Sequence, residues 1–357
     1  MIVINARFLT QQITGTQRFA LQIVSELLAL RNDVVLVAPK GDLISMPENM
    51  KGKVRQFGFS NGHLWEQISL PAYLQQNRRP LLLNLMSTGP MYYKNQVVTH
   101  HDITYVRHPE SFSPSFCKLY AFLVPRMLSN SRHVLTVSNF SKGELASHYK
   151  IPDDKISVIY NAASSDFNAK IVSDTTDTHS YFLAVSSTNV HKNFARLEAA
   201  FRNYAAKGTT QTSLYIVGSQ AKSFALQPTA DSNDGRVRYL GRVSDQELVD
   251  LYKGARAFAF PSIYEGFGIP PIEAQQSGCP VISSHSASMP EVLADSVIYF
   301  DPYDISDIEK AIHRVDTDAA LRADLISRGI QNAATYSWEK SANQVSSLID
   351  SLLQVKN

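Results

Sequence analysis

Short runs of apolar, mostly β-branched residues recur along the chain, separated by segments with helical periodicity. Most of these runs do not alternate with polar residues, as is typical of strands that are covered on both faces. Strands alternating with helices indicate βαβ units and parallel sheets, so the pattern predicts an α/β protein. The expected strands are Ile2–Ile4, Val34–Ala38, Leu81–Leu85, Val97–Thr99, Val134–Val137 and Ile156–Tyr160 in the first half, and Tyr181–Ser186, Leu214–Val217, Val237–Leu240, Ala257–Phe260, Val281–Ser283 and Val297–Phe300 in the second.

Several helices between these runs have recognisable start signals. Asn193 is a favoured N-cap residue, and the apolar residues after it share one helical face. The spacings from Ser244 to Glu247 and from Ser141 to Glu144 match the capping box. The last segment of the chain is also helical, with apolar residues at Trp338, Ala342, Val345, Ile349 and Leu352.

The chain is expected to form two domains. Its 357 residues exceed what one hydrophobic core usually supports, and the strands divide equally around a polar segment without apolar residues at 173–178. We therefore expect an N-terminal Rossmann-like domain at 1–168, a linker at 169–180 and a C-terminal Rossmann-like domain at 181–336. The helix at 337–357 either packs on the C-terminal domain or crosses back to the N-terminal one.

Composition and charge narrow the class of protein. Apolar residues make up 44% and charged residues 18%, which suits a soluble globular enzyme. The net charge of +2 lacks the basic bias of nucleic-acid-binding proteins. Cys117 and Cys279 are too few and too far apart for a disulfide framework or a zinc cluster. The sequence has neither signal-peptide character nor a run of about 20 apolar residues, so we expect a cytoplasmic protein.

The most informative segment for function is a loop that follows a strand of the second half. Gly266 and Gly268 allow backbone amides to approach a ligand closely, and a helix is expected to begin near Pro270. Glu265 lies at the mouth of this loop and Glu273 in the first turn of the helix, where both carboxylates could accept hydrogen bonds from sugar hydroxyls. Alternatively, Glu273 only complements the helix dipole and the glycines only make a turn.

The sequence Glu-Gly-Phe-Gly-Ile-Pro-Pro-Ile-Glu at 265–273 resembles the E-x7-E signature of the retaining glycosyltransferases of family 4. The segments Val134–Ser141, Val158–Asn161 and Pro280–Ser283 resemble further motifs of that family, so the resemblance covers the whole chain. It implies the GT-B fold, in which two Rossmann-like domains with parallel sheets face each other across a cleft. It also implies transfer of a sugar from a nucleotide-sugar donor to a carbohydrate acceptor.

The resemblance assigns the residues of this loop to the donor. Glu273 would bind the ribose hydroxyls of the nucleotide. Arg242 and Val243, which follow an expected strand, resemble the region that meets the nucleobase. Hydroxyls of the donor sugar would be held by Glu265, Gly266, Phe267, Gly268 and Ile269.

Lys192 is the candidate phosphate-binding residue. It immediately precedes the helix expected after Asn193, and a phosphate at a helix N-terminus would interact with both the ammonium group and the helix amides. The alternative is an exposed loop lysine. The resemblance places a lysine here against the donor diphosphate, with an arginine five residues earlier. This sequence has Ser187 at that earlier position, so the neutralisation of the diphosphate depends more heavily on Lys192.

Two further sites are expected in the N-terminal domain. Gly15 opens a helix after the first strand and resembles the family's glycine loop under the diphosphate and the acceptor, with Arg18 facing phosphate or solvent. His101 and Asp102 follow a strand at the position of the family's histidine-aspartate pair. The resemblance implies that His101 approaches the reacting end of the donor sugar, and that Asp102 orients it or meets the acceptor. Alternatively, Gly15 only starts a helix, and the adjacent His100 and His101 at the end of a strand have no functional role.

Other motifs do not support a competing chemistry. Asp316-Thr317-Asp318 has the spacing of a DxD metal motif but lies in an amphipathic helical pattern, which favours a solvated helix face. The sequence contains no P-loop, no G-x-G-x-x-G motif and no G-x-S-x-G hydrolase elbow. We therefore expect a metal-independent transferase without a cofactor, in which Lys192 and helix N-termini stabilise the leaving phosphate.

The resemblance leaves the substrates open. GDP-mannose is the favoured donor because such loops are common among mannosyl- and rhamnosyltransferases, while UDP-hexoses, UDP-N-acetylhexosamines and dTDP-rhamnose are alternatives. The expected acceptor is a lipid-linked oligosaccharide of a surface polysaccharide, such as O-antigen, lipopolysaccharide or capsule. The stretch Phe112–Leu128 combines aromatic residues with Lys118 and Arg126, and it either contacts the inner face of the membrane or forms buried core.

Two other functions compete with this interpretation. A GT-B nucleotide-sugar epimerase would need no acceptor, and the E-x7-E loop argues against it. A non-catalytic sugar- or nucleotide-binding protein of the two-lobed periplasmic kind would not turn over its ligand. Lys192 and the lack of signal-peptide character argue against that function.

Overall fold

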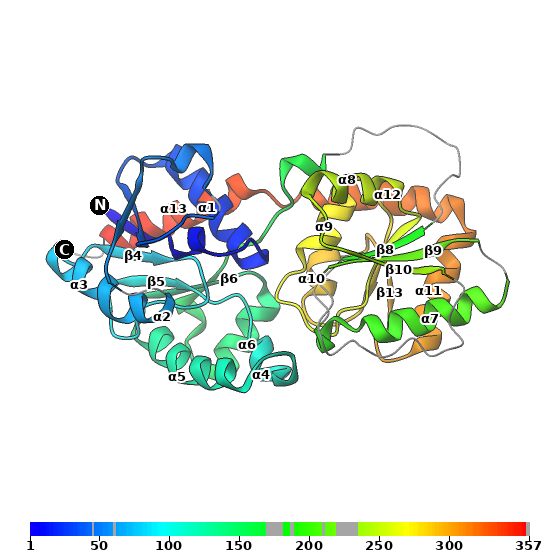
Figure 1. Ribbon diagram of the computed structural model, residues 1–357, viewed down its shortest axis with the longest axis horizontal. Coiled ribbons are helices and arrows are strands. Elements are labelled where there is room, and N and C mark those ends of the chain that lie inside the picture. The colour runs from blue at the N-terminus through cyan, green and yellow to red at the C-terminus, as the bar shows by residue number, and fades with distance from the viewer. Residues whose placement is uncertain are drawn as a thin grey trace. The chain divides into compact units, whose positions relative to one another are not determined.

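The computed structural model describes residues 1–44, 46–59, 62–168, 181–185, 189–208, 211–218 and 235–354. The chain forms two compact units (Figure 1). Unit 1 comprises Met1–Asn161 together with Ser337–Asn357, and unit 2 comprises Ala162–Tyr336.

Unit 1 is built on a seven-stranded parallel sheet with the strand order β3-β2-β1-β4-β5-β6-β7. Every strand expected in this half of the sequence is present, and β3 is an additional one. The sequence pattern missed β3 because this edge strand exposes Arg55 and Gln56 and so has no continuous apolar run. The bounds are β1 Ile2–Asn5, β2 Val34–Pro39, β3 Val54–Phe57, β4 Leu81–Asn84, β5 Gln96–Thr99, β6 His133–Thr136 and β7 Ile156–Val158.

Helices cover both faces of this sheet, with α1 and α13 on one side and α5 and α6 on the other (Figure 1). The predicted capping box at Ser141 is wrong. Ser138 is the N-cap of α6, because its extended backbone lets its hydroxyl accept a hydrogen bond from the Ser141 amide at 3.0 Å. The helices of unit 1 are α1 Gly15–Leu30, α2 Gly62–Leu64, α3 Leu70–Gln76, α4 Thr104–Arg107, α5 Pro114–Asn130, α6 Asn139–Tyr149 and α13 Trp338–Gln354, and a π-helical turn, η3, spans Trp65–Ser69.

The last helix of the chain, α13, packs along α1 in unit 1 (Figure 1). The buried Trp338 ring lies against the Phe19 ring, with 6.1 Å between their centroids. Arg31 at the end of α1 forms an ion pair with Asp350 at 2.7 Å. The sequence left two placements open for this helix, and its contacts belong to the N-terminal unit.

Unit 2 is built on a six-stranded parallel sheet with the order β10-β9-β8-β11-β12-β13, and all strands expected in this half are present. Helices α7 and α11 pack together over one face, where their apolar residues form a buried cluster with the sheet (Figure 1). Of the helices described in either unit, none has the length and hydropathy needed to cross a membrane. The elements are β8 Tyr181–Val185, α7 Phe194–Ala206, β9 Ser213–Val217, β10 Val237–Gly241, α8 Asp245–Gly254, β11 Ala257–Phe260, α9 Ile269–Gln276, β12 Val281–Ser284, α10 Met289–Leu293, β13 Ile298–Phe300, α11 Ile305–Thr317 and α12 Ala319–Ala333.

The boundary between the units lies at Asn161 and Ala162, seven residues before the predicted end of the first domain at 168. Residues 162–168 belong to unit 2 because they bond to its helices. The buried Phe167 ring contacts the Tyr252 ring of α8, and the Phe167 carbonyl accepts a hydrogen bond from the Ser277 hydroxyl at 3.3 Å. The predicted linker at 169–180 lies outside the described residues.

Each sheet has one point where the winding of the chain changes direction. In unit 1 the chain runs from β1 through β2 to β3 and then returns to place β4 on the other side of β1. In unit 2 it runs from β8 through β9 to β10 and then places β11 on the other side of β8. In doubly wound sheets, ligands bind beyond the carboxyl ends of the strands at such switch points. The loops after β1, β4, β8 and β11 are therefore where functional residues are expected.

Candidate functional site

At the switch point of unit 2, the loop after β11 leads directly into α9. Gly268 is the N-cap of α9 and has a φ of +84°, a left-handed conformation that favours glycine. A Cβ at this position would lie 2.7 Å from the Met289 methyl carbon. The structure therefore favours glycine at 268 mainly for its backbone angle, because the Met289 methyl group is the end of a flexible side chain that can shift.

Lys192 and Glu265 meet at this switch point. The Lys192 ammonium nitrogen lies 2.6 Å from a carboxylate oxygen of Glu265, and only about 15% of either side chain is exposed. Lys192 ends the short 3₁₀ helix Val190–Lys192 after β8, and Glu265 lies in the loop after β11. The sequence singled out both residues independently, and the fold brings them into contact. Since an ammonium group has three donors, Lys192 can hold Glu265 and a phosphate oxygen at the same time.

Asn193 fixes the position of Lys192, but not through the predicted helix cap. It occupies the N-cap position of α7 with a φ of 61°, and its side chain does not cap the helix. The side-chain amide nitrogen, Nδ2, instead donates hydrogen bonds to the backbone carbonyls of Pro261, at 3.2 Å, and Pro302, at 2.7 Å. These bonds tie the loop that carries Lys192 to the loops after β11 and β13.

Glu273 is buried within α9, with only 5% of the residue exposed. One of its carboxylate oxygens accepts a hydrogen bond from the Tyr252 hydroxyl of α8 at 3.5 Å. The prediction that Glu273 lies in the first helical turn is wrong, because α9 already begins at Ile269 and has no acidic residue in its first turn. The alternative in which Glu273 only complements the helix dipole is therefore disfavoured, since that effect is confined to the first turn.

The other predicted donor residues of unit 2 are spread more widely. Gly266, Phe267 and Ile269 belong to the loop and start of α9 described above, and Phe267 is buried. Ser187 lies outside the described residues. Arg242 and Val243 follow β10, which is separated from β8 by β9, so they lie at the edge of the same carboxyl end. Arg242 is exposed to solvent.

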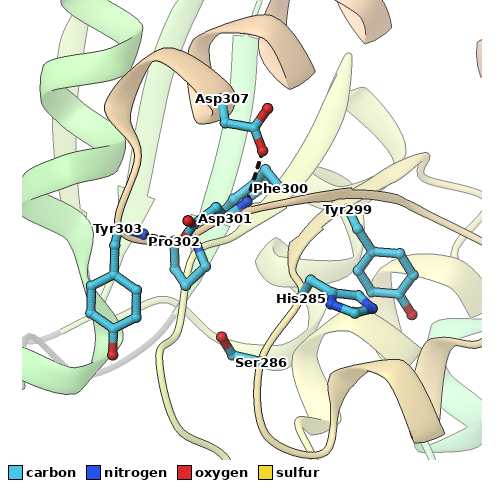
Figure 2. A pocket seen from close by; sticks show the side chains of 8 residues that line it. All are labelled: His285, Ser286, Tyr299, Phe300, Asp301, Pro302, Tyr303 and Asp307. Carbon is cyan, nitrogen blue, oxygen red and sulfur yellow. Dashed lines mark hydrogen bonds between the residues drawn. The ribbon is translucent and has the colours of Figure 1, made fainter.

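A cavity of about 530 Å³ lies at the carboxyl ends of β12 and β13 and was not predicted from sequence (Figure 2). Asp307 of α11 faces the backbone of Asp301 there, and its carboxylate accepts a hydrogen bond from the Asp301 amide at 2.8 Å. Two carboxylates make this cavity unsuitable for a diphosphate. The residues that line it are His285, Ser286, Tyr299, Phe300, Asp301, Pro302, Tyr303 and Asp307.

In unit 1, the predicted histidines follow β5 and are buried. His101 is 7% exposed, lies 3.3 Å through its Nε2 from the Leu85 carbonyl, and contacts the Phe19 ring edge-on. Burial lowers the pKa of His101, and it lowers the pKa of the neighbouring His100 to about 4. Both rings are therefore neutral at physiological pH, so His101 can exchange hydrogen bonds with a sugar hydroxyl without carrying charge.

Asp102 and Gly15 have local structural roles in unit 1. One Asp102 oxygen accepts hydrogen bonds from the amide of Thr104, at 2.8 Å, and from its hydroxyl, at 2.5 Å, which fixes the turn into α4. Gly15 is the first residue of α1 and is exposed, with Thr14 and Gln17 forming a capping box around it. The helix N-terminus is thus built from neighbouring polar residues, and Gly15 leaves it accessible.

One polar cluster of unit 1 was missed entirely by sequence reasoning. Glu66 is fully buried in η3 and forms an ion pair with Arg7 at 3.0 Å. Arg7 follows β1, so this pair lies at the switch point of unit 1. The available signal was the polar ends of two apolar strands, Asn5 after Ile2–Ile4 and Asn84 within Leu81–Leu85. Each unit therefore has an ion pair at the place where its sheet changes winding direction.

Comparison with known proteins identifies the class. Residues 13–167 match the profile of the family described as Glycosyltransferase Family 4, and residues 167–332 match that of Glycosyl transferases group 1. The fold resembles sucrose-phosphate synthase from Thermosynechococcus elongatus, with a TM-score of 0.78 over 99% of both chains and 17% identity. The two family profiles identify a glycosyltransferase, and the two parallel-sheet units with this structural likeness identify its fold as GT-B.

The relatives narrow this class further. Over 281 residues, 78% of this chain and 75% of the relative, the sequence is 32% identical to the O-antigen chain mannosyltransferase RfbU of Salmonella typhimurium. Over 360 residues, 93% of this chain and 94% of the relative, it is 28% identical to O-antigen chain mannosyltransferase B of Escherichia coli. The chain belongs to glycosyltransferase family 4, and it is a hexosyltransferase of polysaccharide synthesis.

Proposed function

We propose that this protein is a retaining, metal-independent mannosyltransferase that transfers mannose from GDP-mannose to a lipid-linked oligosaccharide during O-antigen or related surface polysaccharide synthesis. The observation that carries the proposal is the contact between Lys192 and Glu265 at the switch point of unit 2. In this proposal Lys192 is the cation for the diphosphate and Glu265 is the carboxylate for sugar hydroxyls, and their contact supports both roles. The two O-antigen mannosyltransferase relatives support mannose as the sugar.

Stabilisation of the leaving group is the main catalytic task in this mechanism. As the bond between the mannose anomeric carbon and the diphosphate oxygen breaks, negative charge develops on that oxygen. The Lys192 ammonium and the backbone amides at the starts of α7 and α9 stabilise the charge, which is a role that a divalent metal plays in other transferases. The acceptor hydroxyl forms the new bond on the same face of the sugar, and its proton passes to the departing phosphate.

The remaining donor residues recognise hydroxyl groups. Glu273 accepts hydrogen bonds from the ribose hydroxyls, while Glu265 and the amides of Gly266 and Gly268 hold hydroxyls of the mannose. Because Glu273 is buried beside the Tyr252 hydroxyl, a ligand group that reaches its carboxylate must be a hydrogen-bond donor. In unit 1, the buried and neutral His101 is the residue that we assign to hydrogen bonding with a sugar hydroxyl.

A thermal-shift panel tests the proposed donor and the absence of a metal requirement. In the presence of EDTA, GDP at about one hundred times its Kd should raise the Tm of the nucleotide-binding unit by roughly 5 °C. UDP and dTDP should give smaller shifts, and Glu273→Gln should reduce the shift with GDP. A larger shift with UDP would reassign the donor, and a shift that disappears with EDTA would contradict the metal-independent site.

We also place the membrane-facing surface of unit 1 on α5. Leu119 is 37% exposed and Phe122 49% exposed, and the Arg126 guanidinium lies over the Phe122 ring at 4.0 Å from its centroid. The exposed Leu64 and Ile68 belong to α2 and η3, and α2 lies beside α5 where the His63 and Tyr120 rings meet. Other residues of α5, such as Leu123 and Met127, are buried core, so only part of the predicted stripe is available.

Apolar side chains flanked by Lys118 and Arg126 fit a bilayer with anionic lipids. The full chain should co-sediment with vesicles of phosphatidylglycerol and phosphatidylethanolamine at low salt. Phe122→Glu should abolish this binding, whereas Leu30→Glu, at an exposed position at the end of α1, should not affect it. Equal sedimentation of the two variants, or no binding by the unaltered chain, would rule out this surface.

A further inference from the structure

The switch point of unit 1 contains a buried polar cluster that no predicted role uses. The Asn5 amide nitrogen donates to Glu66 at 2.9 Å and to Asn84 at 3.0 Å. The Thr88 hydroxyl donates to the second Glu66 oxygen at 2.9 Å and accepts from an Arg7 nitrogen at 3.1 Å. Apart from Glu66, which lies in η3, these residues come from β1, β4 and the segments that follow them, which is where a doubly wound sheet binds ligands.

An irregular helix brings Glu66 into this cluster. The π-helical turn η3 buries Glu66 completely, while its neighbours Leu64 and Ile68 are 64% and 49% exposed. The buried Trp65 fixes the turn by donating a hydrogen bond from its indole nitrogen to the Phe57 carbonyl at 2.9 Å. Such π-turns are rare and occur frequently at functional sites.

His63 connects the cluster with solvent. Its Nδ1 lies 3.2 Å from a Glu66 oxygen, and 31% of its side chain is exposed. Burial raises the pKa of Glu66, but the Arg7 guanidinium and the hydrogen bonds from His63 and Asn5 outweigh it and hold that pKa at about 2. Glu66 is therefore a carboxylate that can only accept hydrogen bonds, so His63 must donate from Nδ1. Nε2 is then the ring nitrogen left for a ligand.

The chemistry of this cluster differs from that of the switch point in unit 2. Glycosyl transfer needs two substrates, and the Lys192 site suits the anionic one. In unit 1 the cation of the cluster, Arg7, is 7% exposed and already paired with Glu66, so it does not suit a phosphate. The member of the cluster that reaches the surface is the His63 imidazole, which lies beside the Tyr120 ring. An oriented ring nitrogen beside an aromatic ring suits a neutral carbohydrate, whose hydroxyl groups both donate and accept hydrogen bonds.

We propose that His63, held in orientation by Glu66, binds a hydroxyl group of the carbohydrate acceptor at the switch point of unit 1. His63 is the acceptor-binding residue and Glu66 is a positioning residue. This inference rests on the proposed glycosyl transfer, and it adds a residue that binds the second substrate of that reaction, the carbohydrate acceptor.

Steady-state transfer of mannose from GDP-mannose to methyl α-mannobioside tests this site. His63→Ala should raise the KM for the mannobioside about tenfold, as expected for the loss of one hydrogen bond, and leave the KM for GDP-mannose unchanged. His63→Gln, which can place an amide oxygen near the lost Nε2, should recover part of the affinity. Glu66→Gln should raise the same KM in protein whose folding is verified by its Tm.

A matched control is His108→Ala, which removes a similar histidine whose Nδ1 lies 3.1 Å from Glu110. Its KM values should equal those of the unaltered chain. An unchanged mannobioside KM in His63→Ala, or an equal rise in both KM values, would overturn the assignment.

Direct binding separates this inference from the proposed function. NMR titration of the full chain with methyl α-mannobioside should give saturable shifts that His63→Ala weakens. If the unaltered chain transfers no mannose but binds the mannobioside through His63, the acceptor site stands and the proposed reaction is wrong. If the unaltered chain does not bind the mannobioside, or His63→Ala binds it equally, the acceptor site is wrong.

Discussion

Lys192→Met should lower the kcat for sugar transfer by about a hundredfold or more, because the leaving diphosphate loses its nearest cation. Removing one preorganised donor that stabilises a developing anion typically costs roughly 3–4 kcal/mol of transition-state stabilisation. Lys192 also holds Glu265 at 2.6 Å, so the carboxylate would lose its partner in a site where only 14% of it is exposed. The measurement is the single-turnover rate with saturating donor, using the nucleotide sugar that the thermal-shift panel selects.

The chain offers a close control for this substitution. Lys207 forms an ion pair with Glu309 in the same unit, but 62% of its side chain is exposed. Lys207→Met removes the same charge and the same kind of pair, and it should leave kcat within about twofold, because exposed ion pairs contribute little. If Lys192→Met also retained near-normal turnover, the diphosphate would have to be stabilised elsewhere and the proposed mechanism would fail.

The sequence predicts well those elements whose residues are buried along one continuous segment of the chain. The strands Ile2–Asn5 and Ala257–Phe260 are buried at every position, and the sequence shows this as continuous apolar runs. Because the sheets are parallel, the ends of these runs also locate the loops that carry function. Lys192 and Glu265 could be selected in this way without knowledge of their contact.

Features that depend on distant parts of the chain could not be predicted. Asn193 is a residue type favoured at helix N-caps, but its side chain donates hydrogen bonds to the carbonyls of Pro261 and Pro302 instead. No local sequence pattern reveals those partners. Glu66 lies in the π-helical turn η3, and its burial depends on its ion pair with Arg7, a residue far earlier in the chain. A single carboxylate in such a segment is indistinguishable from a surface residue until tertiary structure pairs it.

The ion pairs at the two switch points differ in their exposure, and we therefore assign them different roles. Both contain a lysine or arginine paired with a glutamate, but the pair in unit 1 is 7% and 0% exposed, and that in unit 2 is 15% and 14% exposed. The more accessible pair can bind a ligand beside its partner, because the Lys192 ammonium group has further donors. The fully buried pair can only hold other groups in place, which is why His63 and not Arg7 is assigned to ligand binding.

The buried pair should also determine the acid stability of unit 1. The pKa of Glu66 falls from 4.5 to about 2 on folding, so the folded state favours the carboxylate. The associated stabilisation is fully present above pH 4.5 and is lost as the pH falls toward 2. A shift of this size corresponds to roughly 3 kcal/mol at neutral pH.

Glu66→Gln should therefore lower the free energy of unfolding of unit 1 by about 3 kcal/mol at pH 7 and reduce its dependence on pH below 4.5, because Arg7 stays buried without a counter-charge. Both tryptophans, Trp65 and Trp338, belong to unit 1, so tryptophan fluorescence during urea denaturation follows this unit selectively. Glu48→Gln, which alters an exposed carboxylate of the same unit, should change the unfolding free energy by less than about 0.5 kcal/mol. Indistinguishable denaturation curves for the two variants at pH 7 would show that the Arg7–Glu66 pair contributes nothing to the stability of unit 1.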